Sequence, residues 1–383
     1  MTPQKTLIID DAIPYANEIF SHLGKVITLP GKCIDTQAVR HADALIIRSR
    51  TQIDQTLLDN STVQFVGSTV VGLDHIDQAY LQQRKITFYS AQGCNANSVA
   101  EFIITTLFDL AEHFKFNLSE KTLGIVGVGH VGKLVHQKAK VLGITCLLND
   151  PPRERKEIHL NHKEGGGESF VSLDKCLTAD IITFHTPLTT TGEDATLDLL
   201  SAERLQQIKP SQIVINAARG GIINEAAWSQ IRTLANVIDC WENEPKISPP
   251  LYQTAYLATP HIAGHSLEAK VAGSEMVYQA LCKAWKIAPK TDWKNFLPPP
   301  TQSITLTEKK TVQATLNALF KQTHDIHKDD QAIRANDIKT VHQRYEYYRR
   351  HFPVYREWHQ HCIKLPNSPL LKKVIKPLRF TTF

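Results

Sequence analysis

The chain has 383 residues, of which 42% are hydrophobic and 21% charged, and 43 Lys and Arg against 38 Asp and Glu give it a formal net charge of +5. The hydrophobic share excludes a disordered chain, and the length suffices for two or three domains with cores of their own. Residues 291–383 contain 16 basic and 8 acidic side chains, a net charge of +8, so the first 290 residues carry −3. A basic C-terminal part favours an oligomerisation face, an anion site or a nucleic-acid-binding arm.

Signals for secretion, membrane insertion and metal binding are weak. The seven cysteines are scattered without a Cys-x-x-Cys pair, which argues against a zinc ribbon or a disulfide framework. His359 and His361 lie near Cys362, but no companion cluster follows them, so we predict no metal site. The N-terminal sequence lacks an apolar core with a cleavage site, and no apolar run of ~18 residues occurs. We therefore expect a cytoplasmic protein that does not associate with membranes.

The first part of the chain alternates short β-rich segments with amphipathic ones. An amphipathic segment at 15–23 lies between the first two predicted strands, and a long apolar-periodic segment at 98–114 predicts a helix. Strands that alternate with helices are typical of a parallel α/β sheet. The predicted strands cover residues 6–12, 25–31, 42–50, 63–72 and 85–93.

A second series of strands is strongly apolar with little alternation, as expected when helices cover both faces of a sheet. A helix is predicted at 264–285 after its last strand, and residues 151–170, with three glycines at 165–167, are predicted to form a surface loop. The predicted strands cover residues 122–129, 144–150, 179–187, 211–220, 236–241 and 255–264. The chain then changes composition at residues 288–300, and basic, aromatic segments with helical periodicity follow at 311–330 and 338–352.

A G-x-G-x-x-G motif joins the first strand of the second series to an amphipathic helix, and Asp150 follows it at the end of the next strand. This context predicts a dinucleotide-binding turn whose backbone N–H groups approach a pyrophosphate. The motif comprises Gly127, Gly129, His130, Val131 and Gly132.

Asp150 is expected to accept hydrogen bonds from the ribose and to repel a 2′-phosphate, so the sequence favours NAD as the cofactor. Arg153 and Arg155 follow closely, which leaves NADP as an alternative. A glycine-rich turn that only packs a helix on a strand is the other alternative.

Arg219, Glu244 and His261 each follow a predicted strand of the second series. Ligands bind beyond the carboxyl ends of strands in such sheets, so we expect these side chains to converge. Arginine is a two-pronged donor for a carboxylate, histidine can take a hydroxyl proton while hydride leaves the same carbon, and a carboxylate can orient the imidazole. Taken one at a time, Arg219 also fits a loop salt bridge, Glu244 a solvated turn residue and His261 a hydrogen-bonded histidine at a strand end. The three residues together favour catalysis.

The motifs GVGHVG, HTPLTTTG, INAARGGIINEAA, DCWENEP and PHIAG resemble, in this order, those of the D-isomer-specific 2-hydroxyacid dehydrogenases. The segments IPYA, IIRSRT, FVGSTVVGLDHID, GCNANSVAEF and NDPPR resemble a branch of that family that acts on a phosphorylated 2-hydroxy acid. HDIHKDD and YEYYRRHFPVYREW resemble the C-terminal dimerisation domain of that branch. The resemblance covers nearly the whole chain.

The resemblance implies a fold of two doubly wound parallel-sheet domains, of Rossmann or flavodoxin type, and a C-terminal α+β dimerisation domain. Residues 1–97 and 265–287 would bind substrate, 98–264 would bind NAD, and 288–383 would form the homodimer. Arg219, Glu244 and His261 would be catalytic, with His261 as proton donor and acceptor. The implied NAD contacts are Asp150, Thr186, Ala217, Ala218, Arg219, Asp239 and Gly264.

Substrate contacts are implied at Ser49, and Arg48 and Arg50 beside it are candidate partners of a phosphate. Val70 occupies the place of the family's substrate-binding threonine, and His265 that of the tyrosine usual after H-I-A-G. Valine donates no side-chain hydrogen bond, whereas His265 still can. The two departures concern substrate choice and affinity, not hydride transfer.

We therefore predict an NAD-dependent dehydrogenase of a phosphorylated 2-hydroxy acid, with a basic C-terminal dimerisation domain and no nucleic-acid partner. One further hypothesis is that Arg349 or Arg350 reaches the partner subunit's active site. The alternatives are a glycerate- or phosphoglycerate-type dehydrogenase and a non-catalytic NAD-sensing regulator. The aromatic residues expected to bury the dimer interface are Tyr345, Tyr347, Tyr348, Phe352 and Trp358.

Overall fold

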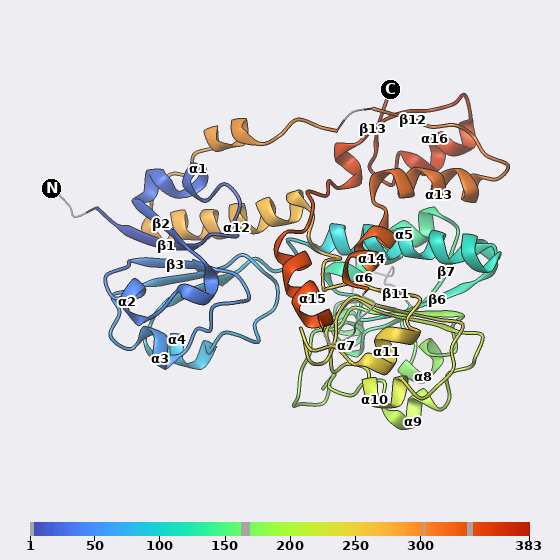
Figure 1. The fold of residues 1–383 in the computed structure, drawn as a ribbon, viewed down its shortest axis with the longest axis horizontal. Helices are drawn as coiled ribbons and strands as arrows, with labels where there is room; N and C mark the ends of the chain where they lie inside the picture. The colour runs from blue at the N-terminus through green and yellow to red at the C-terminus, as the bar shows by residue number, and fades with distance from the viewer. Residues whose placement is uncertain (1–3, 162–168, 302, 335–339) are drawn as a thin grey trace. The chain divides into compact units, whose positions relative to one another are not determined.

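The computed structural model describes residues 4–161, 169–301, 303–334 and 340–383. The chain forms two compact units (Figure 1). Unit 1 consists of residues 1–95 and 265–299, and unit 2 of residues 96–264 and 300–383. The three-domain division with a separate dimerisation domain at 288–383 stays a prediction.

Unit 1 is built on a parallel five-stranded sheet of order β2-β1-β3-β4-β5. The strands are β1 (Thr6–Asp10), β2 (Lys25–Leu29), β3 (Ala44–Ile47), β4 (Phe65–Ser68) and β5 (Thr87–Ser90). Its helices are α1 (Ala16–Phe20), α2 (Thr36–Val39), α3 (Gln55–Leu58), α4 (Gln78–Gln83) and α12 (Leu267–Trp285). All four residues of β3 and of β4 are buried, because helices cover both faces of the sheet.

Unit 2 contains a parallel six-stranded sheet of order β11-β10-β9-β8-β6-β7. Phe170 adds a parallel bridge to Leu148 of β7, and counted as a short strand it gives the Rossmann order 3-2-1-4-5-6, with β11 as a seventh strand beside β10. The strands are β6 (Thr122–Val126), β7 (Thr145–Asn149), β8 (Ile181–Phe184), β9 (Ile213–Asn216), β10 (Ala235–Ile238) and β11 (Leu257–Ala258). The helices are α5 (Ala96–Phe114), α6 (His130–Val141), α7 (Pro151–Asn161), α8 (Leu173–Cys176), α9 (Ala202–Leu205), α10 (Glu225–Trp228) and α11 (Pro249–Thr254).

In the described residues of its C-terminal part, unit 2 combines four α-helices with a small parallel sheet of order β12-β13-β14. These elements are β12 (Ile304–Thr305), α13 (Val312–Thr323), α14 (Ile326–Ile333), α15 (Val341–Arg350), β13 (Cys362–Lys364), α16 (Pro369–Ile375) and β14 (Thr381–Thr382). The predicted fold class is thus confirmed: two parallel α/β sheets and a C-terminal α+β part.

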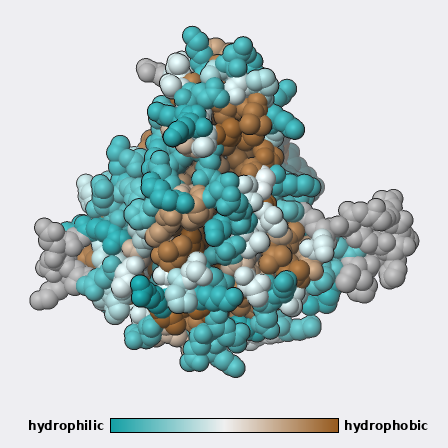
Figure 2. Space-filling model, turned by 90° about the vertical axis from the view of Figure 1, so that its right-hand side faces the viewer, coloured by the Kyte–Doolittle hydropathy of each residue, from teal (hydrophilic) through white to brown (hydrophobic). Residues whose placement is uncertain are grey.

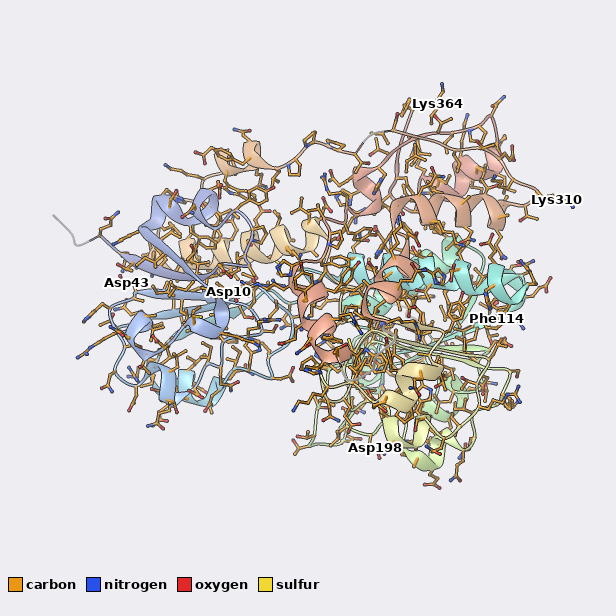
Figure 3. The ribbon with its side chains drawn as sticks, in the orientation of Figure 1. Asp10, Asp43, Phe114, Asp198, Lys310 and Lys364 are labelled. Atoms are coloured by element: carbon orange, nitrogen blue, oxygen red, sulfur yellow. The ribbon has the colours of Figure 1, made fainter. Side chains whose placement is uncertain are left out.

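The surface of the molecule mixes polar and apolar groups. Figure 2 shows hydrophobic side chains in separate groups between hydrophilic ones on one face. The basic side chains Lys310 and Lys364 are exposed in the C-terminal part (Figure 3). Among the described helices, none is both long and apolar enough to cross a membrane.

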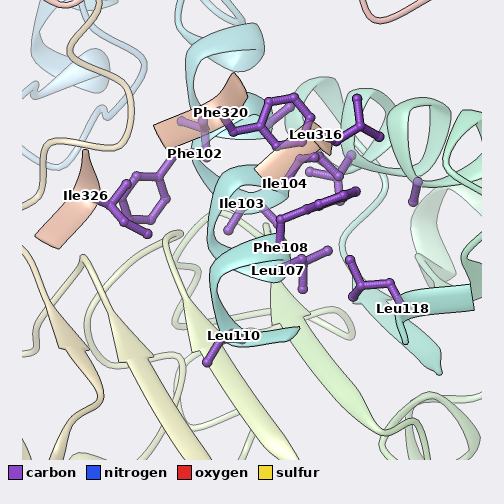
Figure 4. Close-up of a cluster of buried hydrophobic side chains, with 14 of the residues drawn as sticks. Phe102, Ile103, Ile104, Leu107, Phe108, Leu110, Leu118, Leu316, Phe320 and Ile326 are labelled. Atoms are coloured by element: carbon purple, nitrogen blue, oxygen red, sulfur yellow. The ribbon is translucent and has the colours of Figure 1, made fainter. Parts of the chain in front are cut away.

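Helix α5 is buried along nearly its whole length and joins the sheet of unit 2 to the C-terminal helices. Phe108 of α5 meets Phe320 of α13 edge-on, with ring centroids 5.0 Å apart (Figure 4). A polar contact reinforces this packing, since Glu101 of α5 accepts hydrogen bonds of 3.0 Å from the Tyr355 hydroxyl and the Trp358 N–H. Burial raises the pKa of Glu101 to about 8. The C-terminal residues are therefore packed on the predicted NAD-binding residues rather than tethered to them.

Two expectations were wrong. Residues 151–161 form helix α7 rather than a loop, because Asp150 caps its first turn through the Arg153 N–H at 3.0 Å. The three glycines at 165–167 lie outside the described residues. Of the aromatic residues expected at an interface, Tyr345, Phe352 and Trp358 are buried inside their own chain, whereas Tyr347 is 66% exposed.

Candidate active site

The glycine turn lies between β6 and α6, as the motif predicts, and its three glycines do different work. Gly127 has φ +87°, and a Cβ there would lie 2.8 Å from the backbone of Thr186. A Cβ on Gly132 would lie 2.0 Å from the Gly127 carbonyl oxygen, so this glycine permits helix and strand to pack. Around Gly129 a Cβ would meet nothing within 4 Å. An open position at the N-terminus of α6 is what a pyrophosphate needs to approach the backbone.

Substitution by alanine separates these roles. Gly132→Ala is expected to destabilise the fold by about 2–4 kcal/mol, because the methyl group overlaps a backbone oxygen. Gly129→Ala is expected to leave the melting temperature nearly unchanged and to weaken NAD binding, because its methyl group occupies the open position. Thermal denaturation without NAD and a fluorescence titration with NAD measure the two effects. A Gly132→Ala protein with the wild-type melting temperature would contradict this assignment.

Asp150 is tied to the glycine turn, as its Oδ2 accepts a hydrogen bond of 2.8 Å from the Val128 N–H. Arg153 and Arg155, the reason why NADP was an alternative cofactor, have partners within the chain. Arg153 donates to the Val128 carbonyl at 2.8 Å and to Glu157 at 2.7 Å. Arg155 pairs with Asp194. Both guanidinium groups are thus held by the chain itself, which favours NAD over a cofactor with a 2′-phosphate.

Two polar atoms next to the turn are buried without a hydrogen-bond partner among the described residues: His185 Nδ1 and Thr186 Oγ1. His185 Nε2 lies 3.1 Å from the Thr183 hydroxyl, and burial lowers the pKa of His185 to about 3, so its ring is neutral. Unused buried donors and acceptors beside an open glycine turn fit a bound dinucleotide. Sequence reasoning found Thr186 but missed His185, which its position at the end of an apolar strand could have revealed.

His261 and Glu244 form a hydrogen-bonded pair. The two Glu244 oxygens lie 3.0 and 2.9 Å from His261 Nδ1, and the Trp241 N–H donates to Glu244 at 2.9 Å. Nε2, the other ring nitrogen, is therefore the one left for a substrate. His261 has φ +55°, a left-handed conformation that is uncommon outside glycine and frequent at functional sites.

Burial by itself would raise the pKa of Glu244, but His261, Arg349 and the Trp241 N–H outweigh it and lower the pKa to about 2. The carboxylate is therefore ionised and can stabilise a protonated imidazole. Arg349 comes from α15 of the same chain. The charge of this arginine thus acts on Glu244 within one chain. The hypothesis that Arg349 or Arg350 reaches the partner subunit's active site stays a prediction.

The loop that carries His261 is fixed by Asp239, which is buried. Asp239 Oδ1 accepts hydrogen bonds from the Thr259 hydroxyl at 2.7 Å and the Ile262 N–H at 2.8 Å, and Oδ2 accepts one from the Ala263 N–H at 3.1 Å. Burial raises the pKa of Asp239, and the charge of His261 opposes this. Asp239, an expected NAD contact, thus serves first to position the residues before Gly264.

Arg219 follows β9, and Asn216 holds the turn between them. The Asn216 side chain accepts a hydrogen bond from the Ala218 N–H at 3.1 Å and donates to the Arg219 carbonyl at 2.9 Å and the Cys240 carbonyl at 3.3 Å. The backbone of Ala217, Ala218 and Arg219 is thereby joined to the residues after β10. Sequence reasoning missed Asn216, although a polar residue that ends an apolar strand is a usable signal.

Cys240, Glu244 and His261 each place one potential metal-ligand atom within 4.8 Å of the others, the one such group among the described residues. Burial raises the pKa of the Cys240 thiol well above its usual value. A protonated thiol is a poor metal ligand, and the Glu244 carboxylate is already bonded to His261. The arrangement fits an acid–base pair beside a buried thiol better than a metal centre.

The predicted substrate residues belong to unit 1. Arg48 and Ser49 follow β3, Val70 follows β4, and His265 precedes α12. Arg48 donates to the Ala12 carbonyl at 3.4 Å, whereas Ser49 is exposed. The Val70 carbonyl accepts hydrogen bonds from the hydroxyls of Ser68 and Ser90 at 3.2 and 3.1 Å.

Comparison with known proteins shows to which family the chain is similar. Residues 108–263 match the D-isomer specific 2-hydroxyacid dehydrogenase NAD binding domain, and residues 296–376 match DUF3410, a domain of unknown function. The chain is 57% identical over 380 residues to erythronate-4-phosphate dehydrogenase of Hydrogenovibrio crunogenus, which covers 99% of both chains. The chain belongs to the erythronate-4-phosphate dehydrogenase family. Another member, from Ruthia magnifica, is 47% identical over 92% of this chain and 96% of its own.

Solved structures of other dehydrogenases share the fold of this chain. An NAD-dependent formate dehydrogenase from Staphylococcus aureus in complex with NAD is 22% identical, with a TM-score of 0.58 over 75% of this chain and 98% of its own. D-Lactate dehydrogenase from Aquifex aeolicus is 20% identical, with a TM-score of 0.55 over 73% and 95%. The predicted family and NAD as the cofactor are confirmed.

Proposed function

We propose that the chain oxidises 4-phospho-D-erythronate to 2-oxo-3-hydroxy-4-phosphobutanoate with NAD, in the synthesis of pyridoxal 5′-phosphate. The 57% identity to an erythronate-4-phosphate dehydrogenase over almost the entire chain carries this proposal. The hydrogen-bonded His261–Glu244 pair supports catalysis rather than a regulator that only senses NAD, because a sensor has no use for a proton acceptor.

In the proposed reaction His261 Nε2 takes the proton of the substrate's C2 hydroxyl group. NAD held at the glycine turn of Gly127, Gly129 and Gly132 would supply the acceptor for the hydride of the same carbon. Glu244 holds Nδ1 and balances the positive charge that the imidazole gains. Arg219 binds the substrate carboxylate and thereby orients C2. In the reverse direction His261 returns the proton to the carbonyl oxygen.

Steady-state kinetics with purified enzyme and NAD tests this assignment. We expect kcat/KM with 4-phospho-D-erythronate to exceed that with D-glycerate or D-3-phosphoglycerate by at least about 10-fold. D-glycerate lacks the phosphate, and a charged contact contributes about 1.5–3 kcal/mol. D-3-phosphoglycerate is one carbon shorter, so its carboxylate and phosphate do not match the same two binding positions. Turnover that is no higher than with these two acids would overturn the substrate assignment. It would favour the glycerate- or phosphoglycerate-type alternative, to which the loss of a hydroxyl at Val70 points.

We further propose that the enzyme acts as a homodimer in the cytoplasm. Tyr347 and Val354 of the C-terminal part are 66% and 75% exposed, and exposed apolar groups favour an interface there. The seven cysteines are free, as is usual in a reducing compartment. Sedimentation of the full chain and of a Tyr347→Glu, Val354→Glu variant tests whether the chain is a dimer through this surface. If the variant has the same mass as the wild type, the interface does not involve these two residues.

A further inference from the structure

Arg153 is held at the edge of the glycine turn by three groups of its own chain. Its Nε donates to Glu157 at 2.7 Å, a terminal nitrogen donates to the Val128 carbonyl at 2.8 Å, and its Cζ lies 5.5 Å from the centroid of the Phe170 ring. The side chains of Arg153 and Glu157 are both only 23% exposed, so water screens their attraction less than at an open surface. None of these contacts takes part in the proposed hydride transfer.

The glycine turn connects Arg153 to Asp150, the residue expected at the ribose. The Val128 N–H donates to Asp150 Oδ2 at 2.8 Å and the Val128 carbonyl accepts from Arg153, so both side chains meet on one residue of this turn. The Arg153 N–H also donates to Asp150 Oδ1 at 3.0 Å. The guanidinium is therefore beside the expected ribose position, where an arginine accommodates the 2′-phosphate of NADP in other dinucleotide-binding folds.

Glu157 removes this arginine from use. Arg153 and Glu157 are four residues apart on α7, so their side chains share a helix face. A guanidinium paired with a carboxylate presents little net charge to a phosphate, and a phosphate that displaces Glu157 leaves a partly buried carboxylate unpaired. Arg155 also pairs with an acidic residue, Asp194, but its side chain is 43% exposed, so water replaces that partner more readily. The pair of Arg153 and Glu157 is therefore the one that decides what this end of the site can bind.

We propose that Glu157 determines cofactor specificity: by holding Arg153, it prevents the chain from binding the 2′-phosphate of NADP. Asp150 and Glu157 then act in the same direction by different means. Asp150 repels the 2′-phosphate, whereas Glu157 withholds the cation that would compensate for this repulsion. The inference concerns the adenosine end of the cofactor and does not depend on which 2-hydroxy acid is oxidised.

Titration with two adenosine fragments tests the proposal without turnover. Adenosine 2′,5′-bisphosphate carries the 2′-phosphate that distinguishes NADP, and 5′-AMP lacks it. We expect Glu157→Ala to strengthen binding of the bisphosphate about 10-fold in calorimetric titrations, because Arg153 becomes free to form a charge-assisted pair with the phosphate. Binding of 5′-AMP should stay within about 2-fold of wild type. Arg153→Met, added to Glu157→Ala, should cancel the gain.

Glu154→Ala is the matched control, because it removes the same charge from the same helix and keeps the hydrogen bond between Arg153 and Glu157. If Glu154→Ala strengthens binding of the bisphosphate as much as Glu157→Ala does, only the net charge of the helix matters and the proposal is overturned. It is overturned equally if Glu157→Ala binds the bisphosphate with wild-type affinity.

Steady-state kinetics with NADP gives a second readout. Glu157→Ala should raise kcat/KM for NADP about 10-fold through a lower KM, and Asp150→Ser combined with it should raise this value further. If 4-phospho-D-erythronate is not turned over with either cofactor, the proposed function fails while the titrations still decide the role of Glu157. Circular dichroism shows whether Glu157→Ala is folded. Should it not be, Glu157→Gln, which keeps an acceptor but loses the charge, is compared with Glu154→Gln in the same titrations.

Discussion

Replacement of His261 by alanine is expected to lower kcat by about 10²–10⁴-fold, the range for loss of a general base. The imidazole is the group positioned to take the hydroxyl proton, and its Nδ1 is already bound to Glu244. NAD affinity should stay within about 3-fold of wild type, a difference below 1 kcal/mol, because the glycine turn and Asp150 are untouched. Pre-steady-state reduction of NAD, followed by absorbance, measures the chemical step directly.

His41→Ala provides the control for this experiment, since His41 is an exposed histidine of unit 1. It should leave both kcat and NAD binding unchanged. If His261→Ala retains more than a tenth of the wild-type kcat, then His261 is not the proton acceptor. Under the alternative of a regulator that only senses NAD, the wild type binds NAD but has no turnover that the substitution could lower.

Glu244→Gln is expected to lower kcat about 10–100-fold, as is typical when the partner that orients a catalytic histidine loses its charge. The amide keeps a hydrogen bond to Nδ1 but no longer balances the imidazolium. The neutral amide therefore stabilises the protonated imidazole that forms in the reaction less well than the carboxylate does. Glu242→Gln, an exposed carboxyl in the same loop, should leave kcat unchanged.

The same carboxylate links folding stability to pH. The pKa of Glu244 is about 2 in the folded chain, below its ordinary value of 4.5. Its ionised form therefore stabilises the fold at pH values above 4.5, and this contribution is lost as the pH falls towards 2. Glu244→Gln should flatten that part of the stability profile in urea denaturation. A wild-type kcat and a wild-type stability profile in this variant would remove Glu244 from the acid–base pair.

Local sequence patterns were sufficient for much of the fold and the site. The glycine turn could be predicted because Gly127 and Gly132 obey steric limits that are visible in the motif itself. Parallel topology requires polar residues after β9, β10 and β11 to meet at one edge, which is why Glu244 and His261 were found although 16 residues separate them. The basic charge of the C-terminal part was also visible in the sequence. The sequence pattern alone did not decide between an oligomerisation face, an anion site and a nucleic-acid-binding arm.

The tertiary structure decided what depends on contacts between distant segments. The strand at Phe170 is a single bridge, too short for any periodicity to reveal. Trp358 stacks on Phe320 with centroids 4.5 Å apart, so an aromatic residue that seemed suited to an interface belongs to the core.

What the sequence by itself determined is the chemistry: the cofactor turn, the acid–base pair and the family, because each rests on residue types at fixed spacing along the chain. What only the tertiary structure decided is the electrostatic environment. Arg153 fits an NADP site in sequence, and its pairing with Glu157 and the Val128 carbonyl is a property of the packed unit. Desolvation and the distance between charges set such effects, and neither can be read from the order of residues.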